Sequence, residues 1–378
     1  MFTDGIYPYV IGGMQKHSFY LAKYFALNEI YVDLYHTNFT SPVTNEMKEL
    51  TCFSDEEIFF IQPFLIEFPA EKKYPGHYLA ESYEYSERVY DMFCNNSDVD
   101  FIYAKGFSAW KLIDEKRKGY KCPPIGVNFH GYEMFQKPPS FKSRLAQSLF
   151  FRNPVLFNVQ NADCVFSYGG KISEIILKLG VKKEKIIEIS TGIEMNWIVD
   201  KIKTLGQKRK FVFVGRYERR KGIEELNRAL KELIKKYDFE FHFIGNIPPK
   251  RKLFSDKIIY HDMVADSEQL KKLLEGFDIL VCPSHSEGMP NVILEAMALG
   301  LAVIATDVGA VNLMVSSNTG WLINTGKKSE LKKAMINAIH LPAHDINELK
   351  EKSQTHIRQN FLMDQIITKL IKHISLLK

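Results

Sequence analysis

Cysteine and long apolar runs are both scarce in this chain of 378 residues. Its five cysteines are scattered, with no Cys-x-x-C pair: Cys52, Cys94, Cys122, Cys164 and Cys282. This spacing argues against a zinc site and a disulfide framework, and for a reducing compartment. No stretch approaches roughly 18 consecutive apolar residues, the length that predicts a membrane span. The N-terminus also lacks the basic and then apolar segments of a signal peptide, so the sequence predicts neither feature.

Charge is nearly balanced, with 50 Lys and Arg against 45 Asp and Glu, a net charge of +5. This excess is too small to indicate nucleic-acid binding, so no nucleic-acid partner is expected. Apolar residues make up 46% of the chain and aromatic residues 13%, which is enough for large packed cores. Because 378 residues exceed the size at which single cores usually stop growing, two domains are predicted.

Short β-rich runs alternate with helical periodicity, which predicts an α/β fold with parallel sheets. A first series of predicted strands covers 30–35, 101–104, 125–129, 164–167 and 185–189. A second series covers 211–214, 240–244, 258–261, 279–283 and 303–306. Helices are predicted between the strands, for example at 17–27, 222–237 and 267–275.

Two such series indicate two Rossmann-like domains, which we place at residues 1–200 and 201–356, with a polar join near 195–209. Residues 357–378 have the apolar spacing of an amphipathic helix that packs on the protein. Ligands of open α/β sheets bind beyond the carboxyl ends of the strands. The site is therefore predicted in the cleft between the two domains.

The string Ser-His-Ser-Glu-Gly-Met-Pro-Asn in the second half is the most distinctive segment of the chain. Glu287 stands in a polar turn and Glu295 follows eight residues later. Gly288 and Pro290 open a predicted short helix, which Gly300 ends. The free amides at the helix start can bind a phosphate, and the two carboxylates suit the hydroxyls of a sugar and a ribose. The simpler alternative is a pair of surface carboxylates stabilised by the helix dipole.

Two cations follow the first strand of the second series. Arg216 and Lys221 flank a turn just past the strand end, where they are well placed for a diphosphate. Arg219 and Arg220 are expected to be solvated instead. A basic surface turn is the alternative interpretation for Arg216 and Lys221.

In the first half, Gly12 and Gly13 form a loop ahead of a predicted helix, where glycine lets the backbone approach a ligand closely. His130 follows a predicted strand and should therefore lie at the cleft. The alternative for His130 is a loop histidine with a structural role. His17 is expected to be structural or to lie on the acceptor side.

The Glu-Gly-Met-Pro string, set between an apolar strand and an Ala/Leu-rich helix, resembles the Glu-x7-Glu motif of the retaining glycosyltransferases of family 4. The Gly-Arg…Lys-Gly string at Arg216 and Lys221 and the His-Gly-x-Glu string at His130 resemble further motifs of that family. The resemblance spans essentially the whole chain and is strongest over 211–310. It implies the GT-B fold, in which two Rossmann-like domains face each other across a deep cleft and the last helix crosses back to the first domain.

The resemblance also implies roles for individual residues. Arg216 and Lys221 would hold the donor diphosphate, Glu287 the sugar hydroxyls and Glu295 the ribose, while His130 would line the reaction centre. Further donor contacts are implied for Gly12, Gly13, Gly288, Met289, Pro290, Asn291 and Gly309. Neither a metal nor another cofactor is implied, because cations of the protein would stabilise the leaving nucleotide.

These features predict a cytoplasmic retaining glycosyltransferase that uses a nucleotide diphosphate sugar, UDP- or GDP-linked. The expected acceptor is a glycan, a lipid-linked glycan or another hydroxyl compound, in cell-surface polysaccharide or glycoconjugate biosynthesis. Two alternatives stay open. One is a sugar-nucleotide epimerase with the same fold, and the other is a non-catalytic protein that binds nucleotide.

Two further segments carry predictions. Residues 135–153 combine basic and aromatic side chains without an acidic one, which suits contact with the inner face of a membrane, although an ordinary buried helix face explains the pattern as well. The chain begins with Met1 close to the point where the family's first strand should end. We therefore expect either a start further upstream or a sheet that contains only a stub at this position.

Overall fold

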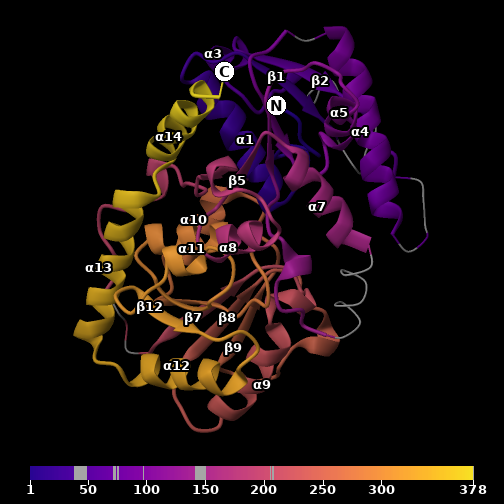
Figure 1. Cartoon of the computed structure of the whole chain (residues 1–378). Coiled ribbons are helices and arrows are strands. Elements are labelled where there is room, and N and C mark those ends of the chain that lie inside the picture. The colour runs from indigo at the N-terminus through magenta and orange to yellow at the C-terminus, as the bar shows by residue number, and fades with distance from the viewer. Residues whose placement is uncertain are drawn as a thin grey trace.

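The structure is a computed structural model that describes residues 1–37, 49–70, 74, 76–96, 98–140, 150–204, 206 and 208–377. Its parallel strands form two lobes, each covered by helices (Figure 1). These are the two α/β lobes with parallel sheets that the strand pattern predicts, in the GT-B-like arrangement that the resemblance implies. Most predicted strands are found within one or two residues of their expected positions.

The C-terminal lobe is built on one six-stranded sheet of order β12-β11-β10-β7-β8-β9. Its strands are β7 (Lys210–Val214), β8 (Glu240–Ile244), β9 (Ile258–His261), β10 (Ile279–Cys282), β11 (Ala302–Thr306) and β12 (Gly320–Ile323). Its helices and 3-10 turns are η5 (Arg219–Lys221), α9 (Ile223–Leu233), η6 (Pro249–Arg251), α10 (Ser267–Leu274), α11 (Asn291–Ala298), η7 (Val311–Leu313) and α12 (Lys328–His340). β12 was not predicted; it is a four-residue edge strand that begins with glycine and contains only three apolar residues in a row.

The N-terminal lobe contains a two-stranded sheet, β1-β2, and a four-stranded sheet, β3-β4-β5-β6. The strands are β1 (Val32–His36), β2 (Ile61–Leu65), β3 (Ile102–Lys105), β4 (Ile125–Asn128), β5 (Cys164–Ser167) and β6 (Ile186–Glu188). The helices and 3-10 turns are α1 (Gly13–Ala26), α3 (Asp55–Ile58), α4 (His77–Asn96), α5 (Trp110–Arg117), η1 (Glu133–Phe135), α7 (Arg152–Asn161), α8 (Lys171–Lys178), η3 (Lys183–Lys185) and η4 (Met195–Trp197). The unpredicted β2 carries Pro63, which pairs with Leu34 and is tolerated because β2 has a partner on one side.

A stub at the start of the chain joins the two N-terminal sheets. Phe2 forms parallel bridges to Tyr35 of β1 and to Ala104 of β3. The amide of Phe2 donates to the carbonyl of Tyr103 at 2.9 Å, and the amide of Tyr35 donates to the carbonyl of Met1 at 2.9 Å. The stub therefore occupies the place of a central strand between β1 and β3.

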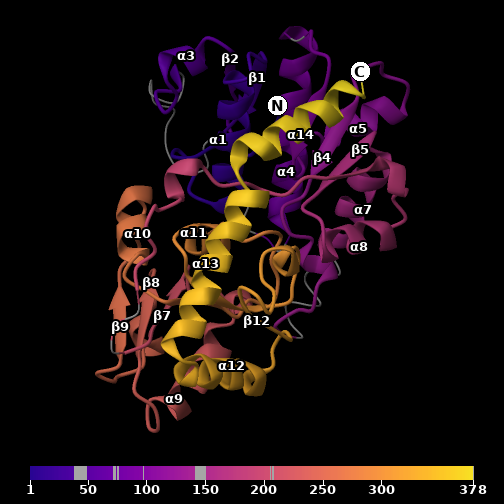
Figure 2. The same cartoon turned by 90° about the vertical axis from the view of Figure 1, so that its left-hand side faces the viewer.

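The two lobes are connected by two crossing segments that lie side by side. Ile193 pairs with Leu362, with hydrogen bonds of 2.8 and 2.9 Å that tie this bridge together. The helix expected over 357–378 is in fact the end of α13 (Ala343–Asn360) and the whole of α14 (Met363–Ser375), with the chain extended between them. α13 packs against α11 of the C-terminal lobe and α14 against α1 of the N-terminal lobe (Figure 2).

Membrane contact through residues 135–153 stays a prediction, because 141–149 lie outside the described residues. At the ends of this segment, the Arg152 guanidinium lies 5.4 Å from the centre of the Phe135 ring, and its Nε donates to the Met134 carbonyl at 3.1 Å. Over the described ranges, none of the helices has the length and apolar character needed to cross a bilayer.

Candidate active site

Glu287 is the buried acid at the centre of the site, in the loop that follows β10. Its side chain is 7% exposed. Lys221 Nζ lies 2.6 Å from Glu287 Oε1, the Ser284 hydroxyl donates to the same oxygen at 2.8 Å, and Arg220 Nη1 lies 3.6 Å from Oε2. Burial by itself would raise the pKa of Glu287, but the two cations outweigh it and hold the pKa below its ordinary value. The site therefore keeps an ionised carboxylate out of water.

The loop that carries Glu287 touches the N-terminal lobe at Gly288. A β-carbon at Gly288 would lie 1.6 Å from the carbonyl oxygen of His130, so only glycine fits at this contact. Gly309 supports the same loop from behind: its φ is +56°, and a β-carbon there would lie 2.3 Å from the carbonyl oxygens of residues 287 and 288. The structure thus brings together Glu287, Gly288, Gly309 and His130, which are far apart in the sequence.

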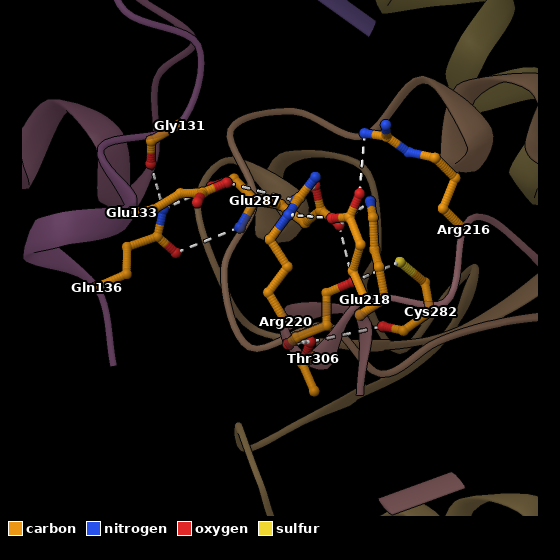
Figure 3. Close-up of polar contacts among 11 residues, drawn as sticks. Gly131, Glu133, Gln136, Arg216, Glu218, Arg220, Cys282, Glu287 and Thr306 are labelled. Atoms are coloured by element: carbon orange, nitrogen blue, oxygen red, sulfur yellow. Dashed lines mark hydrogen bonds and ion pairs between the residues drawn. The ribbon is translucent and has the colours of Figure 1, made fainter. Parts of the chain in front are cut away.

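The cations of the η5 turn are arranged differently from the sequence prediction. Arg216 is 68% exposed and pairs with Glu218 at 2.9 Å (Figure 3). Arg220, which we expected to be solvated, instead reaches toward Glu287 and also lies 3.4 Å from Glu133. The prediction for Arg220 was wrong, because a run of basic residues does not reveal which member of a tight turn faces inward.

Arg219 was also expected to be solvated, and this too was wrong. Its guanidinium donates to both carboxylate oxygens of Glu225, at 2.6 and 2.8 Å. His285 Nε2 lies 3.2 Å from the same carboxylate. Burial opposes ionisation of Glu225, but these two partners lower its pKa to about 2. This cluster anchors the turn that carries Lys221.

Gln136 links the two lobes beside Glu287, and no sequence motif pointed to it. Its side-chain amide donates to the Glu287 carbonyl at 2.7 Å and also to the Gly131 carbonyl (Figure 3). In return, the Glu287 amide donates to Gln136 Oε1 at 3.4 Å. The side chain therefore holds the loops of both lobes in one arrangement.

Glu295 lies on α11 and faces the other lobe. Lys16 of α1 places its Nζ 2.7 Å from Glu295 Oε1 and 5.4 Å from the centre of the Trp197 ring. These side chains line a small crevice between the lobes together with Tyr20, Gly192, Asn291 and Leu294. The ion pair with Lys16 places Glu295 at the contact between the lobes.

Three of the predicted donor contacts, Met289, Pro290 and Asn291, lie at the start of α11. Pro290 is the residue before the helix, and Asn291 is its first residue. Asn291 Oδ1 is buried and lacks a hydrogen-bond partner within the part of the chain that the structure describes. Met289 is fully buried in the C-terminal core, so only its backbone can contact a ligand.

The glycine loop of the N-terminal lobe lies against the same place. A β-carbon at Gly13 would lie 3.5 Å from His130 Nε2 and 4.0 Å from Asn291 Nδ2. Gly12 precedes α1 directly, with Gly13 as the first residue of that helix. The starts of α1 and α11 and the end of β4 therefore converge around His130.

A fully buried lysine lies beneath His130, and sequence reasoning missed it. Lys105 donates to Asn128 Oδ1 at 2.6 Å and contacts His17 Nδ1. Burial lowers the pKa of Lys105 to about 7, although the nearby carboxylate of Asp4 favours its charged form. Burial, and then the charge of Lys105, lowers the pKa of His130 to about 3. Both His130 and the buried His17 are therefore neutral near pH 7.

Acidic clusters elsewhere do not belong to this site. The chain has an Asp-x-Asp string, Asp98-Val99-Asp100, but it precedes β3 and so lies at the amino end of that strand. Among the described residues, one group with suitably close ligand atoms is His344, Asp345 and Glu348, in the first turns of α13. Neither cluster includes a residue of the cleft.

Known glycosyltransferases match this chain in sequence. Residues 208–340 match the family model of the glycosyl transferases group 1. The chain is 31% identical over 192 residues to the putative teichuronic acid biosynthesis glycosyltransferase TuaC of Bacillus subtilis, a match covering 48% of this chain and 48% of that relative. The chain thus spans about half the length of this relative.

Solved structures share the fold over the whole chain. Sucrose-phosphate synthase from Thermosynechococcus elongatus matches with a TM-score of 0.78 and 18% identity, covering 100% of this chain and 96% of that one. Anabaena Alr3699/HepE in complex with UDP-glucose matches with a TM-score of 0.66 and 16% identity, covering 98% of each chain. The chain therefore has a glycosyl transferases group 1 domain over residues 208–340 within a two-domain GT-B-like fold.

Proposed function

We propose that this protein is a retaining glycosyltransferase of family 4 that transfers a sugar from a nucleotide diphosphate sugar to a hydroxyl group. The observation that carries the proposal is the ionised, buried Glu287, which Lys221 and Arg220 neutralise at the contact between the lobes. A buried carboxylate accepts hydrogen bonds from sugar hydroxyls, and cations beside it can stabilise a departing diphosphate. Both requirements of a sugar nucleotide are met in one place.

Donor binding would redistribute these charges. The diphosphate would attract Lys221 and Arg220, with Arg216 joining them after leaving Glu218, while Glu287 accepts hydrogen bonds from the sugar. The backbone amides at the start of α11 and the unsatisfied Asn291 side chain supply neutral polar contacts. Glu295 would exchange Lys16 for the ribose hydroxyls.

In the proposed reaction, an acceptor hydroxyl attacks the anomeric carbon on the face from which the nucleotide departs. The bond from the anomeric carbon to the donor phosphate oxygen breaks, the new glycosidic bond forms, and the acceptor proton passes to the departing phosphate. Lys221, Arg220 and Arg216 stabilise the negative charge that develops on that phosphate. His130 is neutral and lines the reaction centre without carrying a charge. We propose that neither a metal nor another cofactor takes part.

The donor class and pathway follow as parts of the same proposal. HepE is described in complex with UDP and with UDP-glucose, and TuaC as a putative enzyme of teichuronic acid biosynthesis. A UDP- or GDP-linked donor and a glycan or lipid-linked glycan acceptor are consistent with these relatives. We therefore assign the protein to cell-surface polysaccharide or glycoconjugate biosynthesis in the cytoplasm, with the inner face of the membrane as a second location.

A thermal-shift screen with UDP, GDP, ADP and their common sugar conjugates tests the proposal, each with and without EDTA. A ligand at about 100 times its dissociation constant adds about 2.7 kcal/mol to the free energy of unfolding. We expect a selective shift with one nucleotide family that EDTA does not remove. Absence of any shift would contradict the proposal, and loss of the shift with EDTA would contradict metal independence.

An assay of sugar transfer from the selected donor to an acceptor then distinguishes a transferase from a protein that only binds the donor. An epimerase would convert the donor sugar without an acceptor and needs acid and base groups that exchange a proton with the ring. His130, with a pKa of about 3, is poorly suited to that task. A donor that binds without any transfer or conversion would identify a non-catalytic binding protein.

A further inference from the structure

The hydroxyl of Tyr168 lies at the centre of a buried polar cluster behind His130. Tyr168 is 1% exposed. Three polar atoms surround its oxygen: His130 Nδ1 at 3.0 Å, Asn128 Oδ1 at 3.2 Å and His17 Nδ1 at 3.4 Å. A tyrosine hydroxyl has one proton to donate and can accept through its lone pairs. The direction of each hydrogen bond is therefore decided by what the three neighbours can do.

Asn128 can only accept from Tyr168. Its Nδ2 donates to the carbonyl of Phe166 at 3.1 Å, while its Oδ1 accepts from Lys105 at 2.6 Å. The reversed amide would place the NH₂ group against the lysine amine and oxygen against oxygen at Phe166. The orientation of Asn128 is thus fixed from both sides, and Oδ1 faces the tyrosine hydroxyl.

His17 also presents an acceptor to this cluster. Lys105 contacts His17 Nδ1. At pH 6 the lysine is an ammonium group, because burial lowers its pKa only to about 7, and an ammonium group can donate but not accept. His17 Nδ1 therefore carries a lone pair, and the proton of the neutral ring lies on Nε2.

With acceptors at Asn128 and His17, the hydroxyl proton of Tyr168 points to Asn128 Oδ1. Donation to Asn128 leaves one acceptor, His17 Nδ1 at 3.4 Å, facing the tyrosine oxygen without a proton between them, whereas donation to His130 would leave two. The oxygen of Tyr168 then accepts a hydrogen bond from the Nδ1–H group of His130. His130 is the group among the three that can supply one.

We propose that Tyr168 fixes His130 as the tautomer protonated on Nδ1, so that the unprotonated Nε2 faces the cleft beside Gly13 as a hydrogen-bond acceptor. Tyr168 is a positioning residue in this arrangement, and Asn128 and Lys105 orient it. The tautomer assignment depends on the contacts of the cluster and on the ammonium form of Lys105 at pH 6. The ligand that it selects rests on the proposed function: a hydroxyl of the bound sugar donates to Nε2, and a group that can only accept is rejected.

The neutrality of the ring supports this role. Burial, followed by the charge of Lys105, lowers the pKa of His130 to about 3, so the ring carries one proton throughout the neutral range. The atom 3.5 Å from a β-carbon position at Gly13 is Nε2, on the same side as Asn291. A sugar that enters between the glycine loop and α11 therefore meets the lone pair of Nε2 rather than a proton.

Nitrogen-15 NMR of the full-length protein with labelled histidine tests the tautomer without using activity. Long-range couplings from the two ring carbon protons distinguish protonation on Nδ1 from protonation on Nε2, and a His130→Asn variant identifies the signals. At pH 6 we expect His130 to be protonated on Nδ1 and His17 on Nε2. A wild-type spectrum with His130 protonated on Nε2 would overturn the proposal, whatever the variants do.

Two tyrosine variants then test the cause. Tyr168→Phe removes the only hydroxyl in the assignment, and we expect His130 to shift wholly or partly to the Nε2–H tautomer, which is favoured in the free side chain. Tyr132→Phe is the matched control: Tyr132 is 2% exposed, and its hydroxyl has no hydrogen-bond partner among the described residues. The control should keep the wild-type pattern, and an unchanged His130 in a folded Tyr168→Phe protein would overturn the role of Tyr168.

Deoxyfluoro analogues of the donor sugar test the ligand. Fluorine cannot donate a hydrogen bond, so the analogue changed at the hydroxyl beside His130 should bind the wild type about tenfold more weakly than the parent sugar. In Tyr168→Phe this difference should shrink. If no analogue loses affinity, the ligand assignment falls. If no nucleotide sugar binds at all, the proposed function falls, while the NMR spectrum still decides the tautomer.

Discussion

Lys221 Nζ lies 2.6 Å from Glu287 Oε1, and the two residues come from loops that follow neighbouring strands of the C-terminal sheet. β7 and β10 run parallel and adjacent, so their carboxyl ends deliver both side chains to the same edge. Both side chains are largely buried, with exposed fractions of 20% for Lys221 and 7% for Glu287. The adjacency of β7 and β10 therefore brings the two side chains together, and it places a buried ion pair at the entrance of the proposed donor site.

Breaking this pair should affect stability and activity differently. Lys221→Met leaves the Glu287 carboxylate buried with weaker compensation, so we expect the free energy of unfolding to fall by about 1–3 kcal/mol and transfer to be lost. The double variant Lys221→Met/Glu287→Gln removes both charges and should recover most of the stability but none of the activity. Chemical denaturation and a transfer assay measure the two effects.

The exposed pair Lys328 and Glu232 provides the control. Lys328→Met breaks an ion pair of 2.7 Å whose side chains are 40% and 45% exposed, and it should change neither quantity by much. If the double variant is as unstable as Lys221→Met alone, the buried carboxylate is not the cause of the loss.

Substitutions of Arg216 and of Arg220 should change the free energy of unfolding by different amounts. Arg220 already lies 3.6 Å from Glu287 Oε2, so Arg220→Met should raise the pKa of Glu287 and lower both stability and activity. Arg216 is largely exposed, and in the proposed function it reaches the diphosphate after leaving Glu218, so Arg216→Met should lower transfer with almost no change in unfolding. Donor affinity and thermal unfolding of the two variants check this. Equal stability losses would contradict the distinction.

The sequence was informative where chemistry and spacing coincide along the chain. The proximity of Glu287 and Lys221 could be predicted because both follow strand ends at one edge of an open α/β sheet, while their roles in donor binding stay predictions. The strand positions followed from short apolar runs, whereas β2 was hidden by the proline that its edge position tolerates. These predictions depend on local patterns alone.

Side-chain direction and long-range contacts could not be predicted in the same way. Arg220 and Arg216 belong to one basic string, and only the folded η5 turn decides which of them faces Glu287. Lys105 and Tyr168 stand in apolar strand contexts, 63 residues apart in the numbering, and no motif connects them. Both donate to Asn128 Oδ1 because β3, β4 and β5 are adjacent, which an isolated sequence does not specify.

Lys105 should make stability depend on pH above neutrality. Its pKa is about 7 in the folded protein and near 10.5 when unfolded, so between these values the unfolded state binds more protons. The contribution of Lys105 to the free energy of unfolding therefore rises with pH from about 7 toward 10, at up to about 1.4 kcal/mol per pH unit. Below pH 7 both states are protonated, and this dependence disappears.

Unfolding of the wild type and of Lys105→Met by denaturant across pH 6 to 9 measures this slope. The difference between the two proteins should be flat below about pH 7 and should grow above it. Lys231→Met, on the exposed side of α9, serves as the control and should follow the wild type. A parallel pair of curves for the wild type and Lys105→Met would show that the buried amine titrates normally.

Gly288→Ala should separate the two lobes at the site. The new β-carbon would overlap the carbonyl oxygen of His130, where the built distance is 1.6 Å and both atoms belong to backbone segments. The lobes can relieve this overlap only by moving apart, which also stretches the hydrogen bonds of Gln136 to the Glu287 loop. We expect lower activity, a larger radius of gyration by small-angle X-ray scattering, and little change in the unfolding of each lobe. Gly206→Ala, with no atom within 4 Å of its β-carbon position, is the control and should leave all three unchanged. An active Gly288→Ala protein with an unchanged radius of gyration would mean that this contact yields without opening the cleft.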